Sequence, residues 1–259
     1  MTLLDEIPDA ARELARAGRG MRALRLLDAA GTDDPRIALA AAQVAMELDM
    51  RTGTCEAGAR VTIAERICGP VWDVRFLRLR FDYFAQLFTG GDFAFGPDGK
   101  DPALPAELDQ RAGALAADAP DAVRAGWAHM YHGVILDNLV ADRAAAPPHY
   151  AIALRAGETG RDDPLTWEAL RHLGDHDRDA GDLARARERW ERATTLAAGS
   201  GAVGATLAQQ MLLAVLARDT GDEAGSVALA REISRWSAAT GAIRLHRQAE
   251  AFLAGQAVA

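Results

Sequence analysis

The stretch from Trp167 to Leu196 constrains the fold more than any other part of the sequence. Apolar residues recur at helical spacing in two runs, and Ala180-Gly181-Asp182 separates the runs. Such spacing is typical of amphipathic helices, and glycine followed by aspartate is typical of one helix ending and the next being capped. We therefore expect two antiparallel helices joined by a tight turn.

Similar turn signals divide most of the remaining chain into comparable units. They stand at intervals of 35 to 50 residues, at Gly18, Gly53, Gly91, Ala141, Gly181 and Gly221. A repeated interval of this size is typical of stacked helical repeats. Residues 89–105 interrupt the pattern, and their glycine and proline content predicts a long loop without regular structure. Because Phe95 is unusual in a solvated loop, we expect this loop to fold back onto the helices.

Composition favours an all-α protein and excludes several classes of partner. Valine, isoleucine, tyrosine and threonine are sparse, and no segment alternates strictly between polar and apolar residues, so strands are not expected. The net charge of −8 argues against a nucleic-acid partner, which requires a basic surface. No apolar run is long enough to span a membrane. These features suit a cytoplasmic protein with neither nucleic acid nor membrane as a partner.

The unit at Trp167–Leu196 resembles the tetratricopeptide repeat. The resemblance rests on Leu173-Gly174, Gly181-Asp182, Ala186, Trp190 and Ala193. Forty residues upstream, Ala146, Tyr150 and Ala153 occupy the matching positions. The resemblance implies a right-handed α-solenoid of about six antiparallel helix pairs, formed by residues 1–259 as a single domain. A last helix at Ala242–Leu253 would cap it, because a terminal repeat otherwise exposes its apolar face. Similar repeats occur in bacterial regulators.

The same resemblance implies that ligands contact the first helix of each pair, which lines the concave face. In the strongest unit this selects a polar stripe on one helix face: Glu168, Arg171, Asp175, Arg178 and Asp179. Two guanidinium groups in such a stripe could grip a carboxylate. The alternative is a solvated face that carries ion pairs, Arg171 with Asp175 among them. We favour the solvated face but keep the stripe as the leading candidate site.

Histidines and their neighbours form a second group of candidates. His172 and His176 lie four residues apart, which allows a shared metal, and His129 and His132 lie in the equivalent helix one unit earlier. A zinc site needs three or four converging ligands, although Asp137, Asp175 and Asp177 could supply an oxygen. We favour hydrogen bonding between helices for these histidines and expect no metal or cofactor. His132, His172, Tyr131 and Asn138 remain candidate binding residues.

The aromatic helix expected at Val71–Phe88 also has two interpretations. Its rings and arginines could form a groove for an apolar peptide, or Trp72, Phe76 and Tyr83 could be core residues packed under the long loop. We favour core packing.

The sequence thus predicts a binding or scaffold module, possibly regulatory, that holds a protein segment or peptide on the concave face. The alternative is a small-molecule binder or atypical enzyme, in which the loop closes over a cavity lined by His129, His132, Arg171 and His172. No nucleophile motif, phosphate-binding loop or metalloprotease motif is present, so catalysis is the less favoured interpretation.

Overall fold

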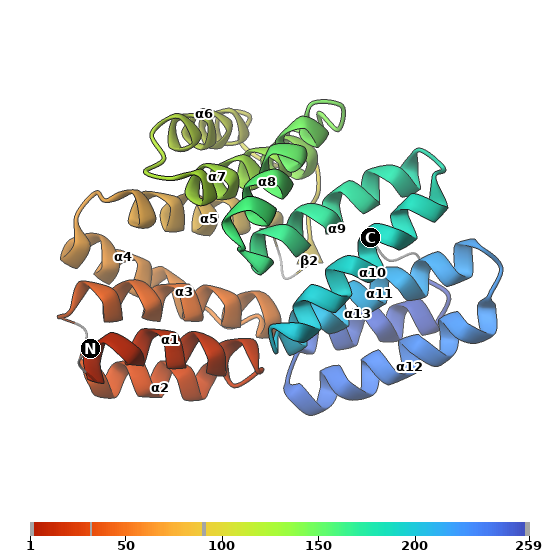
Figure 1. Ribbon diagram of the computed structural model, residues 1–259, viewed down its shortest axis with the longest axis horizontal. Coiled ribbons are helices and arrows are strands. Elements are labelled where there is room, and N and C mark those ends of the chain that lie inside the picture. Colours follow the sequence, from red (N-terminus) through yellow and green to blue (C-terminus); the bar gives the residue numbers. More distant parts are fainter. Residues whose placement is uncertain (1–2, 32, 90–91, 257–259) are drawn as a thin grey trace.

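The computed structural model describes residues 3–31, 33–89 and 92–256, and this part of the chain is helical apart from one small hairpin (Figure 1). The helices are α1 (Leu3–Arg16), α2 (Gly20–Ala30), α3 (Pro35–Thr52), α4 (Ala57–Cys68), α5 (Trp72–Leu87), α6 (Ala103–Ala117), α7 (Ala122–Ile135), α8 (Ala146–Gly160), α9 (Asp163–Asp179), α10 (Leu183–Gly199), α11 (Val203–Asp219), α12 (Glu223–Thr240) and α13 (Ile243–Leu253). A π-helix, η1 (Leu136–Val140), continues α7. The all-α prediction is confirmed.

The helix ends follow local signals in the sequence. At the starts of five helices an aspartate side chain accepts a hydrogen bond from a backbone N–H group of the first turn. These aspartates are Asp34, Asp121, Asp162, Asp182 and Asp222. These bonds satisfy donors that a helix start leaves without a partner. The predicted turn residues in the described part of the chain all have positive φ, namely Gly18, Gly53, Ala141, Gly181 and Gly221. Gly91 lies outside the described residues.

The long loop contains more regular structure than its composition predicts. Strands β1 (Phe88–Thr89) and β2 (Asp92–Phe93) pair in antiparallel register. The expectation of a wholly irregular loop was therefore wrong, because two short extended segments can pair even where glycine and proline are frequent.

Consecutive helices pack against one another, and one packing arrangement occurs twice. In the pair α9 and α10, Trp190 is buried against Gly174, where a Cβ would lie 2.4 Å from the indole Nε1. In the pair α7 and α8, Tyr150 is buried against Gly133, where a Cβ would lie 2.5 Å from the ring. A missing side chain on the first helix thus admits a large ring from the second.

The C-terminal helices contact helices from the N-terminal part of the chain. The C-terminal helix α13 packs on α12, as a cap would, but it also contacts α3 (Figure 1). The Arg244 guanidinium lies 3.6 Å from the centroid of the Phe88 ring and beside Gly53 at the end of α3. Arg51 of α3 packs against Gly204 of α11. The succession of helices therefore closes into a ring.

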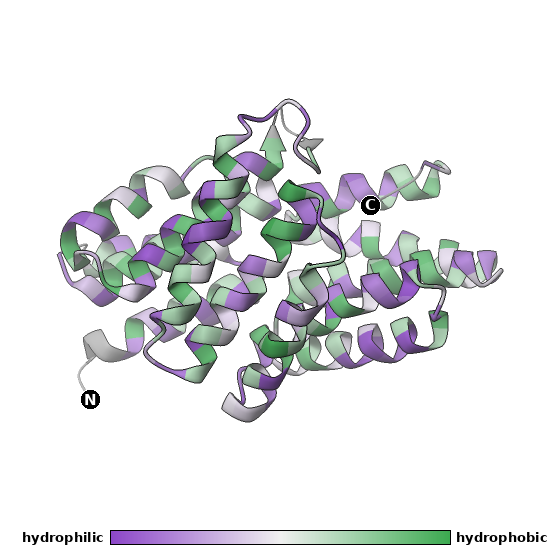
Figure 2. Cartoon of the chain, turned by 90° about the horizontal axis from the view of Figure 1, so that it is seen from above, coloured by the Kyte–Doolittle hydropathy of each residue, from purple (hydrophilic) through white to green (hydrophobic). Residues whose placement is uncertain are grey.

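Hydrophobic and hydrophilic residues are interspersed along the helices (Figure 2). The two largest buried clusters lie among α1 to α5 and among α5 to α9, so α5 contributes to both. In the described ranges, no helix is both long and apolar enough to cross a membrane.

Candidate functional site

A cavity of about 1440 Å³ lies inside the ring. Its lining comes mainly from the odd-numbered helices, each of which turns one face inward. Loop residues Phe95 and Gly96 also reach it. The Gly96 backbone N–H donates to the Asn138 carbonyl oxygen at 2.7 Å, and the Lys100 ammonium donates to two carbonyl oxygens of the same loop. The loop therefore folds back onto the helices, although Phe95, on which this expectation rested, remains 47% exposed.

One wall of the cavity is aromatic. Trp72 stacks on Phe76 with their ring centroids 4.9 Å apart, and Phe76 meets Tyr131 edge to face. The Arg80 guanidinium lies 5.4 Å from the Tyr131 ring, and its Nε donates to the Tyr131 hydroxyl at 2.9 Å. Trp72, Phe76 and Tyr83 are buried, as the core interpretation of this helix requires. The same three residues also face the cavity, so they shape it as well.

Asp137 forms a polar hub beside the cavity. Its carboxylate accepts hydrogen bonds from the Tyr150 hydroxyl at 3.0 Å and from Arg143 at 2.9 Å, and it lies 3.0 Å from His176 Nε2. Burial raises the pKa of this carboxyl, but His176, Arg143 and Tyr150 outweigh burial, so the pKa lies below its ordinary value. Asp137 belongs to the π-helix, a feature that often marks functional sites.

Two groups on α9 titrate abnormally. Burial lowers the pKa of His172 to about 3, and its ring stacks on Tyr150 with centroids 5.0 Å apart. Burial raises the pKa of Asp175 to about 6, although 32% of its side chain remains accessible. His172 is therefore neutral at pH 7, and Asp175 is ionised there only by a modest margin.

The polar stripe predicted on α9 faces the cavity. Its members Glu168, Arg171, Asp175, Arg178 and Asp179 all line it, as do Tyr131, Asn138 and His172. Some of these candidates already form hydrogen bonds with other residues of the protein. Arg178 donates to Asp219, and Asp179 accepts from Arg143.

The ion pair expected between Arg171 and Asp175 does not form. The Arg171 guanidinium instead lies 4.0 Å from the Glu168 carboxylate.

The histidines do not converge as the alternative prediction required. His172 and His176 lie with Tyr150 and Asp137. His132 does not line the cavity, and neither does His129. The His132 Nε2 lies 2.7 Å from Asp109 of α6. The predicted cavity lined by His129, His132, Arg171 and His172 was therefore wrong, because only Arg171 and His172 line the observed one.

Two arginines in the cavity wall retain unused donors. Arg51 Nε and Arg171 Nε are buried, and neither has a hydrogen-bond partner among the described residues. A buried N–H without an acceptor costs about 1–3 kcal/mol. Neither atom is accessible to solvent, so a bound molecule could satisfy these donors only after the guanidinium groups turn toward the cavity.

Sequence reasoning missed several cavity residues. Glu47 projects from the second turn before the end of α3 into the cavity, and no predicted site included it. Arg80 also projects into the cavity from α5, the helix for which a groove was the less favoured interpretation. The signal for Glu47 was present, because an acid stands beside the apolar residues Val44 and Leu48. Nothing in the sequence indicated that this face of α3 would lie opposite α9.

A comparison with protein-family models finds no match for this chain, and a comparison with curated proteins finds none either. The candidate site therefore rests on its geometry alone.

Proposed function

We propose that this protein is a binding module that holds an extended, partly acidic peptide segment of another protein in the central cavity. The observation that carries the proposal is the pair of unused guanidinium donors, Arg51 Nε and Arg171 Nε, in the wall of a cavity that also presents aromatic and charged side chains. A guanidinium group binds carboxylates through directed, charge-assisted hydrogen bonds.

The size of the cavity supports a peptide. Pockets for small molecules usually enclose about 300–1,000 Å³, whereas this cavity encloses about 1440 Å³. Its aromatic wall at Trp72, Phe76 and Phe84 would take apolar side chains, and the arginines would take an acidic one. The expected occupant thus carries both kinds of residue.

The proposal includes a finer description of the fold. We take the helices as about six antiparallel pairs of a right-handed, tetratricopeptide-like solenoid, with its concave face turned into the cavity. The repeated packing of Trp190 on Gly174 and Tyr150 on Gly133 supports this view. A cytoplasmic, bacterial protein with neither nucleic acid nor membrane as partner remains our expectation from composition.

Selection from a displayed library of random linear peptides tests the proposed function. We expect enriched peptides to combine an acidic residue with aromatic or aliphatic ones. Their affinity should fall at least about tenfold in Arg171→Ala, since a hydrogen bond to a charged group contributes about 1.5–3 kcal/mol. The control is Arg192→Ala on α10, where Arg192 pairs with Glu158 outside the cavity lining. Equal binding by both variants, or no enrichment at all, would reject the proposal.

A small-molecule ligand is the second candidate, and one observation favours it. The loop residues Phe95 and Gly96 reach the cavity, as a closing lid would. Native mass spectrometry of gently purified protein separates the two candidates, because a retained ligand shows its own mass. A metabolite mass that is lost in Arg171→Ala would replace the peptide by a small acidic molecule.

A further inference from the structure

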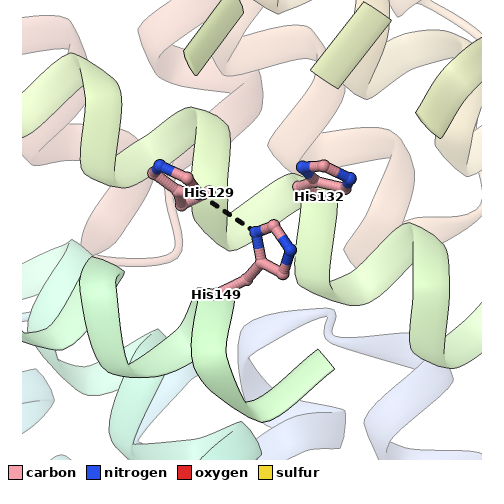
Figure 3. A group of neighbouring side chains, drawn as sticks. All are labelled: His129, His132 and His149. Atoms are coloured by element: carbon pink, nitrogen blue, oxygen red, sulfur yellow. Dashed lines mark hydrogen bonds between the residues drawn. The ribbon is translucent and has the colours of Figure 1, made fainter. Parts of the chain in front are cut away.

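Three histidines from two neighbouring helices meet at a place outside the cavity lining. His129 and His132 lie one turn apart on α7, and His149 lies in the first turn of α8 (Figure 3). One ring nitrogen from each can be chosen so that the three lie within 4.8 Å of one another. The Nδ1 atoms of His129 and His149 are 3.0 Å apart. All three histidines are half-buried.

We propose that His129, His132 and His149 bind a divalent zinc ion that links α7 to α8, with water completing the coordination. Imidazole nitrogens suit zinc, and three histidines with one open position are an established donor set for this ion. Nitrogen ligands at about 2.0–2.1 Å in tetrahedral geometry are separated by about 3.4 Å. The rings therefore need only small shifts to accept the ion.

Asp109 of α6 lies close to the cluster, although the geometry of its contact with His132 is not that of a hydrogen bond. Its carboxylate Oδ1 lies 2.7 Å from His132 Nε2. A carboxylate on the outer nitrogen of a ligating histidine fixes the ring and raises the basicity of the other nitrogen. That other nitrogen, His132 Nδ1, is buried and has no hydrogen-bond partner in the described part of the chain. A metal ion would bind the lone pair of this nitrogen.

The competing explanation is simple packing. His132 and His149 have ring centroids 4.0 Å apart, and a hydrogen bond joins His129 to His149. Such contacts would hold α7 and α8 together without any ion. They would not produce a saturable metal signal, so metal binding distinguishes the two explanations.

The test uses the full chain without a histidine tag, stripped of metal by a chelator. Calorimetric titration with Zn²⁺ should show one ion per chain, and the ion should raise the Tm because it binds the folded state. Titration with Co²⁺ should produce visible d–d absorption of a nitrogen-ligated ion. Thiolate charge-transfer absorption should be absent, which excludes Cys55 and Cys68 as the ligands.

Three variants decide the outcome. His149→Gln should abolish the Co²⁺ spectrum, and Asp109→Asn should weaken Zn²⁺ binding by about 10–100-fold. His246→Gln on α13, which lies beside Ser234 far along the chain, is the matched control and should bind like the wild type. Circular dichroism confirms that each variant is folded. Absence of stoichiometric binding by the wild type, or binding by His149→Gln equal to that of His246→Gln, would overturn the proposal.

Discussion

Gly174 shows how one missing side chain determines helix packing. Trp190 is 1% exposed and lies against Gly174, and its indole Nε1 donates to the Arg171 carbonyl oxygen at 2.9 Å. This contact also brings α10 against the backbone that carries the Arg171 guanidinium to the cavity. Packing and candidate site therefore meet at one residue.

Gly174→Ala should destabilise the protein by about 2 kcal/mol. The added Cβ would lie 2.4 Å from Trp190 Nε1, so the indole must shift and its hydrogen bond must lengthen. Overpacking of this kind costs about 1–3 kcal/mol, which exceeds the gain in helix propensity. Urea unfolding followed by circular dichroism measures the change.

Gly199 near the end of α10 is the matched control. A Cβ there would meet nothing within 4 Å. Gly199→Ala should therefore leave stability unchanged or raise it by up to about 1 kcal/mol. If both alanine variants behave alike, the close approach at Gly174 does not carry the packing energy assigned to it.

At the residue scale, the sequence predicted which residues share a face of one helix better than it predicted contacts between residues of different helices. The stripe from Glu168 to Asp179 faces the cavity because a fixed helical period sets which residues share a face. Tyr131 and His132 were grouped although successive helical residues point about 100° apart. Tyr131 lines the cavity, whereas His132 lies against Asp109. His149 was missed because its position depends on how α8 lies against α7.

At the scale of elements, the π-helix η1 gives the fourth unit its distinct geometry. It ends at Ala141, a non-glycine residue with φ of 63°. The wider turn places Asp137 against groups from α8, α9 and the following loop. No feature of the sequence was recognised as a signal for this π-helix.

Asp137→Ala should destabilise the protein by about 3 kcal/mol. The substitution leaves Tyr150, His176 and Arg143 without their shared acceptor, and removing one partner from a buried ionic network costs about 3–5 kcal/mol. Tyr150→Phe removes only one of these bonds and should cost about 1 kcal/mol. Urea unfolding gives both values.

Asp98 in the long loop provides the control for this series, because it is exposed. Asp98→Ala should change stability by less than about 0.5 kcal/mol. An Asp137→Ala variant as stable as Asp98→Ala would show that the hub contributes nothing to holding α8 and α9 together.

At the scale of the whole molecule, closure of the ring converts a helical surface into a cavity. The sequence predicted most helices and the face that each presents, since both follow from local periodicity. It predicted α13 only as a cap. The contact of α13 with α3 depends on small rotations accumulated over every intervening pair, and no local pattern encodes their sum. The sequence alone therefore could not predict that the candidate site lies inside a ring of helices.

Arg244→Glu should open the ring and enlarge the molecule. Arg244 lies over the Phe88 ring and beside the end of α3, so a shorter, negative side chain loses the cation–π contact and is repelled by the negative face of the ring. Small-angle X-ray scattering should give the wild type a radius of gyration of about 18 Å, the value for a compact chain of this length. The variant should exceed it. Arg247→Glu makes the same charge change at an exposed position of α13 and should match the wild type. Equal radii for the two variants would show that other contacts hold the ring closed.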